Sequence, residues 1–279
     1  FTAFANVIGG VYLARGGRFE ARDGLLVGAS GALYLGGMVL NDLFDRRVDA
    51  VERPDRPIPS GAVSPASAAI LGFGLLVLGV VLAGMFGPQT LLVAVALTAA
   101  ILLYDGRLKG TALGPLAMGT CRLLNVVLGL CAASPGAWSS VAVTAALVMG
   151  AYTAIITYLA RDEVGGSSRM RAQSSIAMMS LLAAVAGVAL IEKMWGQWMR
   201  FVLTAPFAAA VLVQGRRLFA PLWTESSGGA IGRAIGGGIL LMPAIDATMV
   251  AAAGWAWPAV VVFACAAPAY VLRRWYYLT

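Results

Sequence analysis

The sequence predicts an all-α, polytopic membrane protein: a single domain over residues 1–279, folded as a bundle of nine or ten transmembrane helices. Composition is the first observation, because 60% of the 279 residues are hydrophobic, 12% are charged and the mean hydropathy is +0.83. About a quarter of the residues in ordinary soluble domains are charged. The second observation is a series of apolar runs of about 17 to 25 residues, the length that spans a bilayer. These runs lie near residues 1–14, 24–44, 64–86, 89–104, 111–133, 139–160, 174–192, 198–215, 229–252 and 257–277.

The first run is short because the chain begins inside it, at Phe1. We expect further residues upstream of the numbering, and we see a truncated helix rather than a cleavable signal. The net charge of +7 does not predict nucleic acid as a partner, because the basic residues are scattered singly through the loops and form no contiguous patch. The expected surroundings are the lipid bilayer.

Basic residues in the loops predict how the bundle is oriented. Short loops rich in Lys and Arg stay on the cytoplasmic side of a membrane, and most such residues follow even-numbered runs. The acidic motif described next should then face the cytoplasm, although three arginines between the first two runs oppose this. Even-numbered runs are followed by Arg46, Arg47, Arg53, Arg56, Arg107, Lys109, Arg161, Arg169, Arg171, Arg216 and Arg217, and the other loops carry Arg15, Arg18, Arg22 and Lys193.

The second run ends in a motif that carries three aspartates on one helix face. Asp42, Asp45 and Asp49 are spaced i, i+3, i+7, which places them within an arc of roughly 60° on a helix. Uncompensated negative charge beside an apolar run is costly, so a cation should sit there. Mg²⁺ is the natural candidate, since it takes one or two carboxylates and completes its shell with waters and phosphate oxygens. The alternative is a solvated, salt-bridged helix end; we favour a functional site because charge is concentrated here and almost nowhere else.

The segment after this motif is basic and stiff. Arg53, Arg56 and Ile58 each precede a proline, which pushes them toward extended backbone. Gly61 gives the backbone freedom to change direction after these prolines. Ser64 with Pro65 is then a typical start for the next helix. A charged loop of fixed shape suits the capture of phosphate, because arginine binds its oxygens in bidentate fashion.

Two later helices add candidate residues for the same site. The fourth run ends in a second basic loop on the same predicted side, where Arg107 and Lys109 are candidates for contact with a phosphate. The fifth run contains Arg122 and Asn125, spaced i, i+3 on one face. An arginine at that depth faces the interior of a bundle and pairs with an anion. A functional role is favoured for it over a structural ion pair.

A second cluster of charge follows the sixth run. Asp162 and Glu163 lie about 120 residues after the first motif, again at a helix end on the predicted cytoplasmic side. Two such clusters facing each other across one cavity would each offer a metal site. Two polar residues remain open: Asn6 is a candidate for helix packing or ligand contact, and Asp246 is an intramembrane carboxylate that is either functional or structural.

Cysteine and histidine usage limits the chemistry further. Cys121, Cys131 and Cys265 lie in apolar runs without metal-ligand spacing and are interpreted as small buried hydrophobes. The chain has no histidine, so imidazole is not available as a base, an acid or a metal ligand.

With both clusters in view, the chain resembles the UbiA superfamily of intramembrane prenyltransferases. The family's Asn-Asp-x-x-Asp-x-x-x-Asp motif, followed by Arg-x-x-Arg-Pro and a glycine, matches this sequence closely. Tyr104 and Lys109 resemble the family's tyrosine and lysine after the fourth helix, and Arg122 and Asn125 its polar positions in the fifth. The first motif is matched by Asn41, Asp42, Asp45, Asp49, Arg53, Arg56, Pro57 and Gly61.

The resemblance implies a bundle of about nine spans around a large cavity, with any tenth, C-terminal span an addition. It also implies Mg²⁺-dependent transfer of an isoprenyl group from an isoprenyl diphosphate to a small acceptor. On this basis Asp42, Asp45 and Asp49 would hold one Mg²⁺, and Asp162 with Glu163 a second. Arg53, Arg56, Lys109 and Arg122 would neutralise the diphosphate, which Asn41, Tyr104 and Asn125 would help to bind. Asp42, Asp45, Lys109, Arg122 and Asp162 are then the expected catalytic residues.

The second motif departs from the family's Asp-x-x-x-Asp, because Gly166 stands where the second aspartate is expected. Glu163 then substitutes, or one metal is held more loosely, or the catalytic cycle is impaired. The residues around both motifs are most similar to the bacterial EboC-type branch. That branch implies a bacterial inner-membrane protein with a polyol acceptor such as a cyclitol.

The donor is expected to be geranyl or longer, because each buried CH₂ contributes about 0.8 kcal/mol. The acceptor's proton would leave to a carboxylate, to the departing diphosphate or to water. Two alternatives differ in class: a transporter or exporter that uses Arg122 and Asp246 along its path, and a non-catalytic isoprenoid-binding protein of the same fold. A CDP-alcohol phosphotransferase would also cluster aspartates, but its Asp-Gly-x-x-Ala-Arg run does not occur in this sequence.

Overall fold

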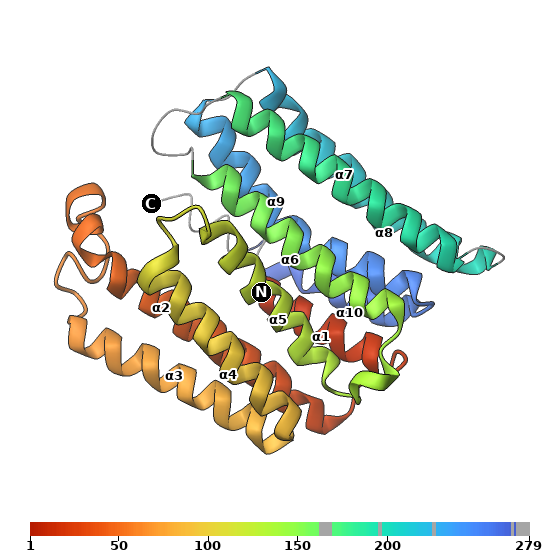
Figure 1. Cartoon of the computed structure of the whole chain (residues 1–279), viewed down its shortest axis with the longest axis horizontal. Coiled ribbons are helices and arrows are strands. Elements are labelled where there is room, and N and C mark those ends of the chain that lie inside the picture. Colours follow the sequence, from red (N-terminus) through yellow and green to blue (C-terminus); the bar gives the residue numbers. More distant parts are fainter. Residues whose placement is uncertain (162–168, 195–196, 225–226, 269–270, 272–279) are drawn as a thin grey trace.

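The described part of the chain forms ten α-helices and no strand, as the sequence predicts (Figure 1). The structure is a computed structural model and describes residues 1–161, 169–194, 197–224, 227–268 and 271. Seven of these helices are long and apolar enough to cross a membrane, and α1, α5 and α10 are shorter apolar helices. The helices are α1 (Thr2–Ala14), α2 (Gly24–Glu52), α3 (Pro65–Phe86), α4 (Pro88–Leu103), α5 (Gly114–Leu130), α6 (Ser140–Ala160), α7 (Arg169–Met194), α8 (Trp198–Phe219), α9 (Gly228–Ala252) and α10 (Ala256–Ala264).

Each predicted run corresponds to one helix, and α2 extends farthest beyond its predicted end. It continues to Glu52, eight residues beyond the predicted end, so that the whole acidic motif is helical. It ends there because Arg53 precedes Pro54 and leaves the helical region, with φ −144° and ψ 65°. The predicted start of α3 is confirmed, since the Ser64 side chain accepts a hydrogen bond from the Ser67 backbone N–H at 3.0 Å.

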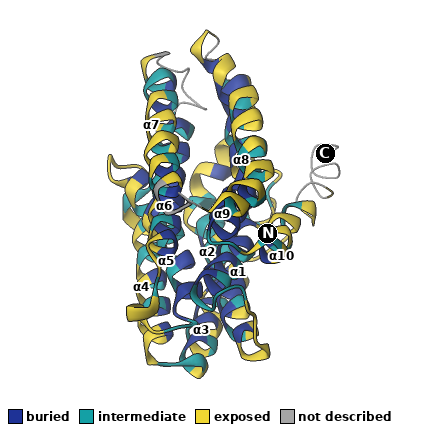
Figure 2. Ribbon diagram, turned by 90° about the vertical axis from the view of Figure 1, so that its right-hand side faces the viewer, coloured by how far each residue is buried: buried dark blue, intermediate teal, exposed yellow. Residues whose placement is uncertain are grey.

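The helices form a buried centre and an exposed periphery (Figure 2). Within an apolar stretch of 18 residues, 72% of the residues of α9 are buried, whereas the corresponding share in α8 is 6%. One hydrophobic cluster joins α1 to α2, α3, α4 and α5, and another joins α1 to α5, α6, α9 and α10. The short helix α1 therefore lies between the two halves of the bundle and contacts both.

Two glycines allow α1 to pack directly against α5. A Cβ atom added at Gly129 would lie 2.2 Å from the Val7 carbonyl oxygen, and one added at Gly10 would lie 2.6 Å from the Val126 carbonyl oxygen. Small residues permit this close approach of backbones in membrane bundles. Polar side chains of α1 and α5 can consequently reach one another inside the apolar bundle.

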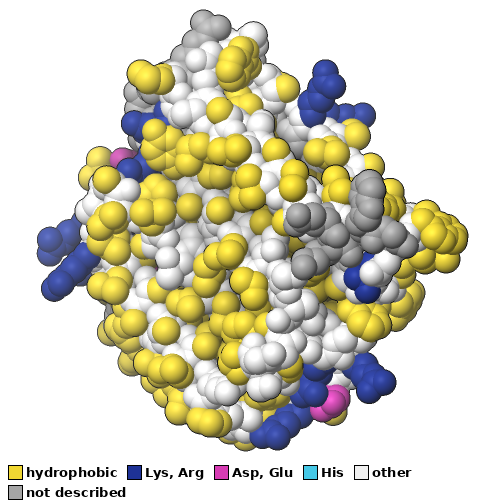
Figure 3. Space-filling view, turned by 45° about the vertical axis from the view of Figure 1, so that its right-hand side comes forward, with side chains coloured by type: hydrophobic (Ala, Val, Ile, Leu, Met, Phe, Trp, Pro, Cys, Tyr) yellow, Lys and Arg dark blue, Asp and Glu magenta, His cyan; other side chains and the backbone are white. Residues whose placement is uncertain are grey.

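The outer surface agrees with a membrane protein. Hydrophobic side chains cover most of the face in Figure 3, and lysines and arginines gather near its edges. Two of the arginines that oppose the predicted orientation have structural partners. Arg15 pairs with Glu20 at 2.7 Å and with Asp23 at 3.0 Å, and Arg22 donates to the Phe86 carbonyl at 2.8 Å, at the end of α3.

Candidate active site

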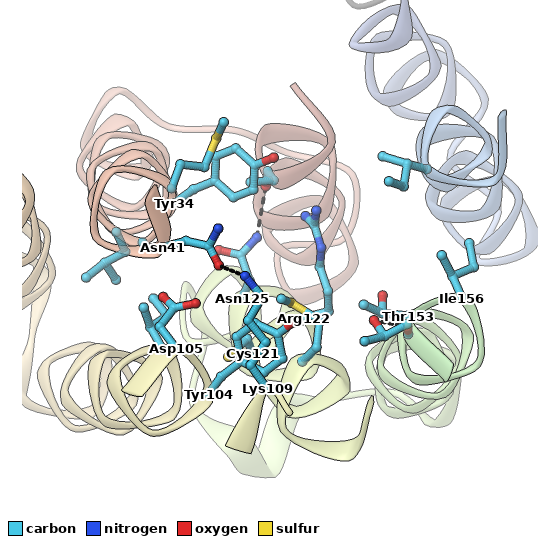
Figure 4. A pocket seen from close by; sticks show the side chains of 18 of the residues that line it. Tyr34, Asn41, Tyr104, Asp105, Lys109, Cys121, Arg122, Asn125, Thr153 and Ile156 are labelled. Carbon is cyan, nitrogen blue, oxygen red and sulfur yellow. Dashed lines mark hydrogen bonds between the residues drawn. The ribbon is translucent and has the colours of Figure 1, made fainter. Parts of the chain in front are cut away.

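A cavity of about 560 Å³ opens among α2, α4, α5, α6 and α9 (Figure 4). Its volume lies within the usual range for ligand pockets, about 300 to 1,000 Å³. Polar side chains from α2, α5 and the 104–109 segment gather on one side of it, and apolar side chains complete the wall. The apolar lining includes Leu97, Ile101, Ile156, Ile239 and Met242.

The acidic motif lies at the polar side of this cavity and is paired with cations of the same chain. Asn41 and Asp42 line the cavity directly. The Arg56 guanidinium bridges two aspartates of α2, donating to Asp49 at 2.8 Å and to Asp42 at 3.1 Å. Because Arg56 also lines the cavity, the loop after α2 folds back over the helix that precedes it.

Lys109 makes the second pairing. Its ammonium donates to the Asn41 amide oxygen at 2.8 Å and forms an ion pair with Asp45 (Figure 4 shows the Asn41 contact). Lys109 follows a single π-helical turn, Tyr104–Leu108, in which its backbone N–H bonds to the Tyr104 carbonyl at 2.8 Å. Such turns are often found at functional sites, and this one places Tyr104 and Lys109 together on the cavity wall.

Arg122 and Asn125 reach the cavity from α5, as their spacing predicts. Arg122 lies eight residues from the start of α5, a rise of roughly 12 Å along the helix axis. Its guanidinium donates to Asn6 at 3.0 Å and to Thr2 at 2.9 Å, and lies 5.4 Å from the centre of the Tyr34 ring. Asn125 is 6% exposed and accepts a hydrogen bond from Ser30 at 2.7 Å.

Not every predicted residue joins this cluster. Arg53 is exposed at the end of α2, and within the described ranges its guanidinium makes no hydrogen bond or ion pair. Asp45 and Asp49 stand behind the lining, held by Lys109 and Arg56. Asp162 and Glu163 lie outside the described residues, as does Gly166.

The donors of the first motif suit a hard cation that is only partly held by protein. All are carboxylate or amide oxygens, which Mg²⁺ prefers. Among the described residues, however, no three acidic or thiol side chains lie close enough together to hold a metal ion. The three aspartates share a helix face but separate into two cation-paired sets. The residues fit an ion that takes one or two carboxylates and receives its other oxygens from a phosphate.

Several lining residues were not among the predicted site residues. Tyr34 lies seven residues before Asn41 on α2, so helical periodicity places both on one face and could have found it. Asp105 and Thr153 also line the cavity. Asp105 adjoins Tyr104 in sequence, but a π-helical turn directs its side chains and no sequence pattern announces that turn. Thr153 carried no signal, since lone threonines are common in transmembrane helices.

Fold and site together define a polytopic, all-helical membrane protein in which carboxylates and cations border a largely apolar cavity. Residues 3–231 match the sequence model of the UbiA prenyltransferase family. The chain belongs to this family, and thus to the enzymes that transfer prenyl groups.

Curated relatives are similar in sequence to part of this chain. Digeranylgeranylglyceryl phosphate synthase of Methanothrix thermoacetophila is 41% identical over 101 residues, 36% of this chain and 38% of the relative. The protein of that name from Methanopyrus kandleri is 38% identical over 122 residues, 42% of this chain and 45% of the relative. The matched segments thus span less than half the length of these relatives.

Solved structures share the fold across most of the chain. A UbiA homologue from Aeropyrum pernix K1 superposes with a TM-score of 0.67 at 20% identity, covering 89% of this chain and 96% of that one. A structure from work on digeranylgeranylglyceryl phosphate synthase in membranes gives a TM-score of 0.62 at 18% identity, covering 90% and 92%. These two likenesses support the UbiA-like fold.

Proposed function

We propose that this protein transfers a long isoprenyl group from an isoprenyl diphosphate to a small acceptor within the membrane. One observation carries the proposal: at the border of an apolar cavity, Asn41 and Asp42 of α2 lie beside the cations Arg56 and Lys109. Oxygen ligands and cations together bind a metal diphosphate, and the apolar wall accepts a hydrocarbon chain. Family membership supports the same reaction.

The cavity favours a long donor chain. Burial of each CH₂ contributes about 0.8 kcal/mol, and the apolar part of the lining includes isoleucine, leucine and methionine side chains. We propose geranyl or longer, with geranylgeranyl favoured because the curated relatives are digeranylgeranylglyceryl phosphate synthases.

Asp42 and Asp45 are the proposed ligands of a first Mg²⁺, with Asp49 in support, and Asp162 with Glu163 of a second. Bound there, the metal supplies Lewis-acid stabilisation of the phosphate charge. Arg56 and Lys109 pair with the same carboxylates, so these cations and a metal would compete for the carboxylate oxygens. In the second pair only one aspartate of the usual two is present, because Gly166 stands at the position of the other.

The chain's own groups then act mainly through preorganised charge. Cleavage of the allylic carbon–oxygen bond leaves negative charge on the diphosphate, and Arg56 and Lys109 are placed to neutralise it. We assign Arg122 the same electrostatic role farther along the cavity, with Tyr104 and Asn125 as polar contacts. Arg53, which is exposed, remains a proposed contact of the diphosphate through the loop. The apolar wall excludes water, which would otherwise quench the allylic cation.

Two acceptor classes are proposed. The names of the curated relatives favour a glyceryl phosphate that already carries one geranylgeranyl group. The sequence of the two motif regions, which resembles the EboC-type branch, favours a polyol such as a cyclitol. Both acceptors present a hydroxyl, so transfer to oxygen is common to them. The distribution of Lys and Arg further supports a cytoplasmic active site, in a bacterial inner membrane if the EboC-type branch is correct.

The test is turnover in liposomes. Labelled geranylgeranyl diphosphate and Mg²⁺ would be supplied with geranylgeranylglyceryl phosphate, with a cyclitol or with an aromatic acid, and the product mass read. We expect one acceptor to gain a prenyl group, and Asp42→Asn and Asp45→Asn to lose that activity. Unchanged rates in both variants would contradict the metal assignment. Donor binding without any product would contradict the enzymatic proposal, and flux without diphosphate release would favour a transporter.

A further inference from the structure

A chain of polar contacts runs from α9 through α1 to the cavity. Asp246 of α9 accepts a hydrogen bond from the Asn6 amide nitrogen at 2.6 Å. The Asn6 amide oxygen in turn accepts one from the Arg122 guanidinium at 3.0 Å. Asp246 is 4% exposed and Asn6 is fully buried, so of the three only Arg122 lines the cavity.

We propose that Asp246 is a positioning residue, which acts through Asn6 to hold Arg122 as a phosphoryl-binding group along the cavity wall. This inference rests on the proposed function for the identity of the ligand. It assigns a role to a carboxylate that the catalytic proposal leaves unused.

Asp246 sets the direction of the Asn6 amide. An amide presents an oxygen acceptor on one side and an NH₂ donor on the other. Because the Asp246 carboxylate takes the NH₂ side, the oxygen must face the Arg122 guanidinium, which has only donors. Without Asp246 the amide is free to turn, and its NH₂ group would then face a cation.

The intervening amide also determines how much of the arginine's charge remains available. Arg56 and Lys109 contact aspartates directly, so each is already paired with an anion. Arg122 instead contacts the neutral groups of Asn6 and Thr2 and lies over the Tyr34 ring. The negative charge of Asp246 balances the positive charge of Arg122 through the intervening Asn6, so the carboxylate does not cover the guanidinium.

The packing of the helices fixes this geometry. α1 approaches α5 closely at Gly10 and Gly129, and α9 passes against Gly9, where an added Cβ would lie 3.6 Å from the Asp246 Cβ. The Arg122 side chain therefore contacts α1 and α2 directly, and α9 acts on it through the Asp246–Asn6 hydrogen bond. Among the described residues the direct partners of Arg122 are neutral, and an intramembrane arginine held in this way suits an incoming anion.

The ligand chemistry is a phosphoryl group, which has two sources in the proposed reaction. It belongs either to the diphosphate of the donor or to the phosphate of the acceptor. Arg122 lines the same cavity as Lys109 and Arg56 but belongs to a different helix, so a phosphoryl group from either source can reach it there.

The experiment is a double-mutant cycle read by ligand affinity. The full-length protein in detergent is titrated separately with inorganic pyrophosphate and with glycerol 3-phosphate, each with Mg²⁺, and thermal unfolding reports binding. We expect Asp246→Leu to weaken one of the two by about tenfold, the effect of losing one hydrogen bond to a charged group. The affected probe identifies the source.

In an Arg122→Gln background, Asp246→Leu should have no further effect, because residues that act through one another are not additive. Asp246→Asn should retain most of the affinity, since its amide oxygen still accepts from Asn6. Thr248→Val is the matched control: that buried hydroxyl lies on the same helix but bonds to the Ala244 carbonyl, so its loss should leave both affinities unchanged.

Full additivity of Asp246→Leu and Arg122→Gln, or wild-type affinity for both probes in Asp246→Leu, would overturn the inference. Should Asp246→Leu yield no folded protein, Asn6→Leu breaks the same link and is judged by the same criteria. Probe binding does not require turnover. A wild-type protein that transfers no prenyl group would therefore refute the proposed function while the affinity cycle still decides this inference.

Discussion

Replacement of Arg56 should strengthen magnesium binding while it weakens diphosphate binding. Arg56 contacts Asp49 at 2.8 Å and Asp42 at 3.1 Å, so a metal that takes an oxygen of either aspartate competes with the guanidinium. Arg56→Gln removes that competitor and keeps a polar, uncharged side chain. The same change removes a cation from the proposed diphosphate site.

The magnitude follows from exposure. The Asp42 side chain is 49% exposed and that of Arg56 33%, so this pair contributes little, about 0 to 1 kcal/mol. The Asp49 side chain is 8% exposed, and a hydrogen bond to such a charged group contributes about 1.5 to 3 kcal/mol before screening is discounted. A combined cost on the order of 1 to 2 kcal/mol corresponds to a gain of about 5- to 30-fold in Mg²⁺ affinity.

Titration with Mg²⁺ alone, followed by thermal unfolding in detergent, measures this gain. Arg53→Gln is the matched control, because Arg53 lies three residues earlier and within the described chain its side chain contacts no carboxylate. Its titration should coincide with that of the wild type. If the Mg²⁺ concentration at half-saturation is equal or higher in Arg56→Gln than in the wild type, the competition argument is refuted.

Three further outcomes are expected. Lys109→Met removes the ammonium that binds Asn41 and Asp45 and should raise the KM for the isoprenyl diphosphate about tenfold or more, since a charge-assisted contact is lost; an unchanged KM would remove Lys109 from the site. Gly129→Ala places a methyl group 2.2 Å from the Val7 carbonyl oxygen, and should lower the free energy of unfolding by about 1 to 3 kcal/mol, whereas Gly74→Ala, which meets no atom within 4 Å, should be nearly neutral. Gly61→Ala forces a non-glycine residue to φ 79° and should cost about 1 kcal/mol in thermal stability; a wild-type Tm would contradict the strain.

The sequence predicted the helices well because most of them are apolar runs of membrane length. It also placed the acidic motif on one helix face and assigned Lys109, Arg122 and Asn125 to the same cavity, where they lie. These predictions depend on local spacing, on the rule that intramembrane charges face inward, and on the resemblance to the UbiA superfamily. The apolar run predicted a shorter α2 because its hydropathy falls where the charged motif begins, whereas the helix itself continues to Glu52, two residues before Pro54.

Contacts between distant residues could not be predicted. Asn6 and Asp246 are separated by 240 positions, and nothing in either local pattern identifies the other as its partner. Likewise, the division of three aspartates between Arg56 and Lys109 depends on where two loops fold back. Periodicity gives the face of a helix, whereas the choice of partner is made by tertiary packing.

The pairing of each motif aspartate with a nearby cation makes substitutions in this motif change two groups at once. Removal of Asp45 leaves Lys109 without its carboxylate, and removal of Arg56 leaves Asp42 and Asp49 without their cation. Membrane insertion and yield are therefore expected to fall along with catalysis in single alanine variants. Charge-matched exchanges made on both partners together, such as Asp45→Asn with Lys109→Gln, would separate the two effects.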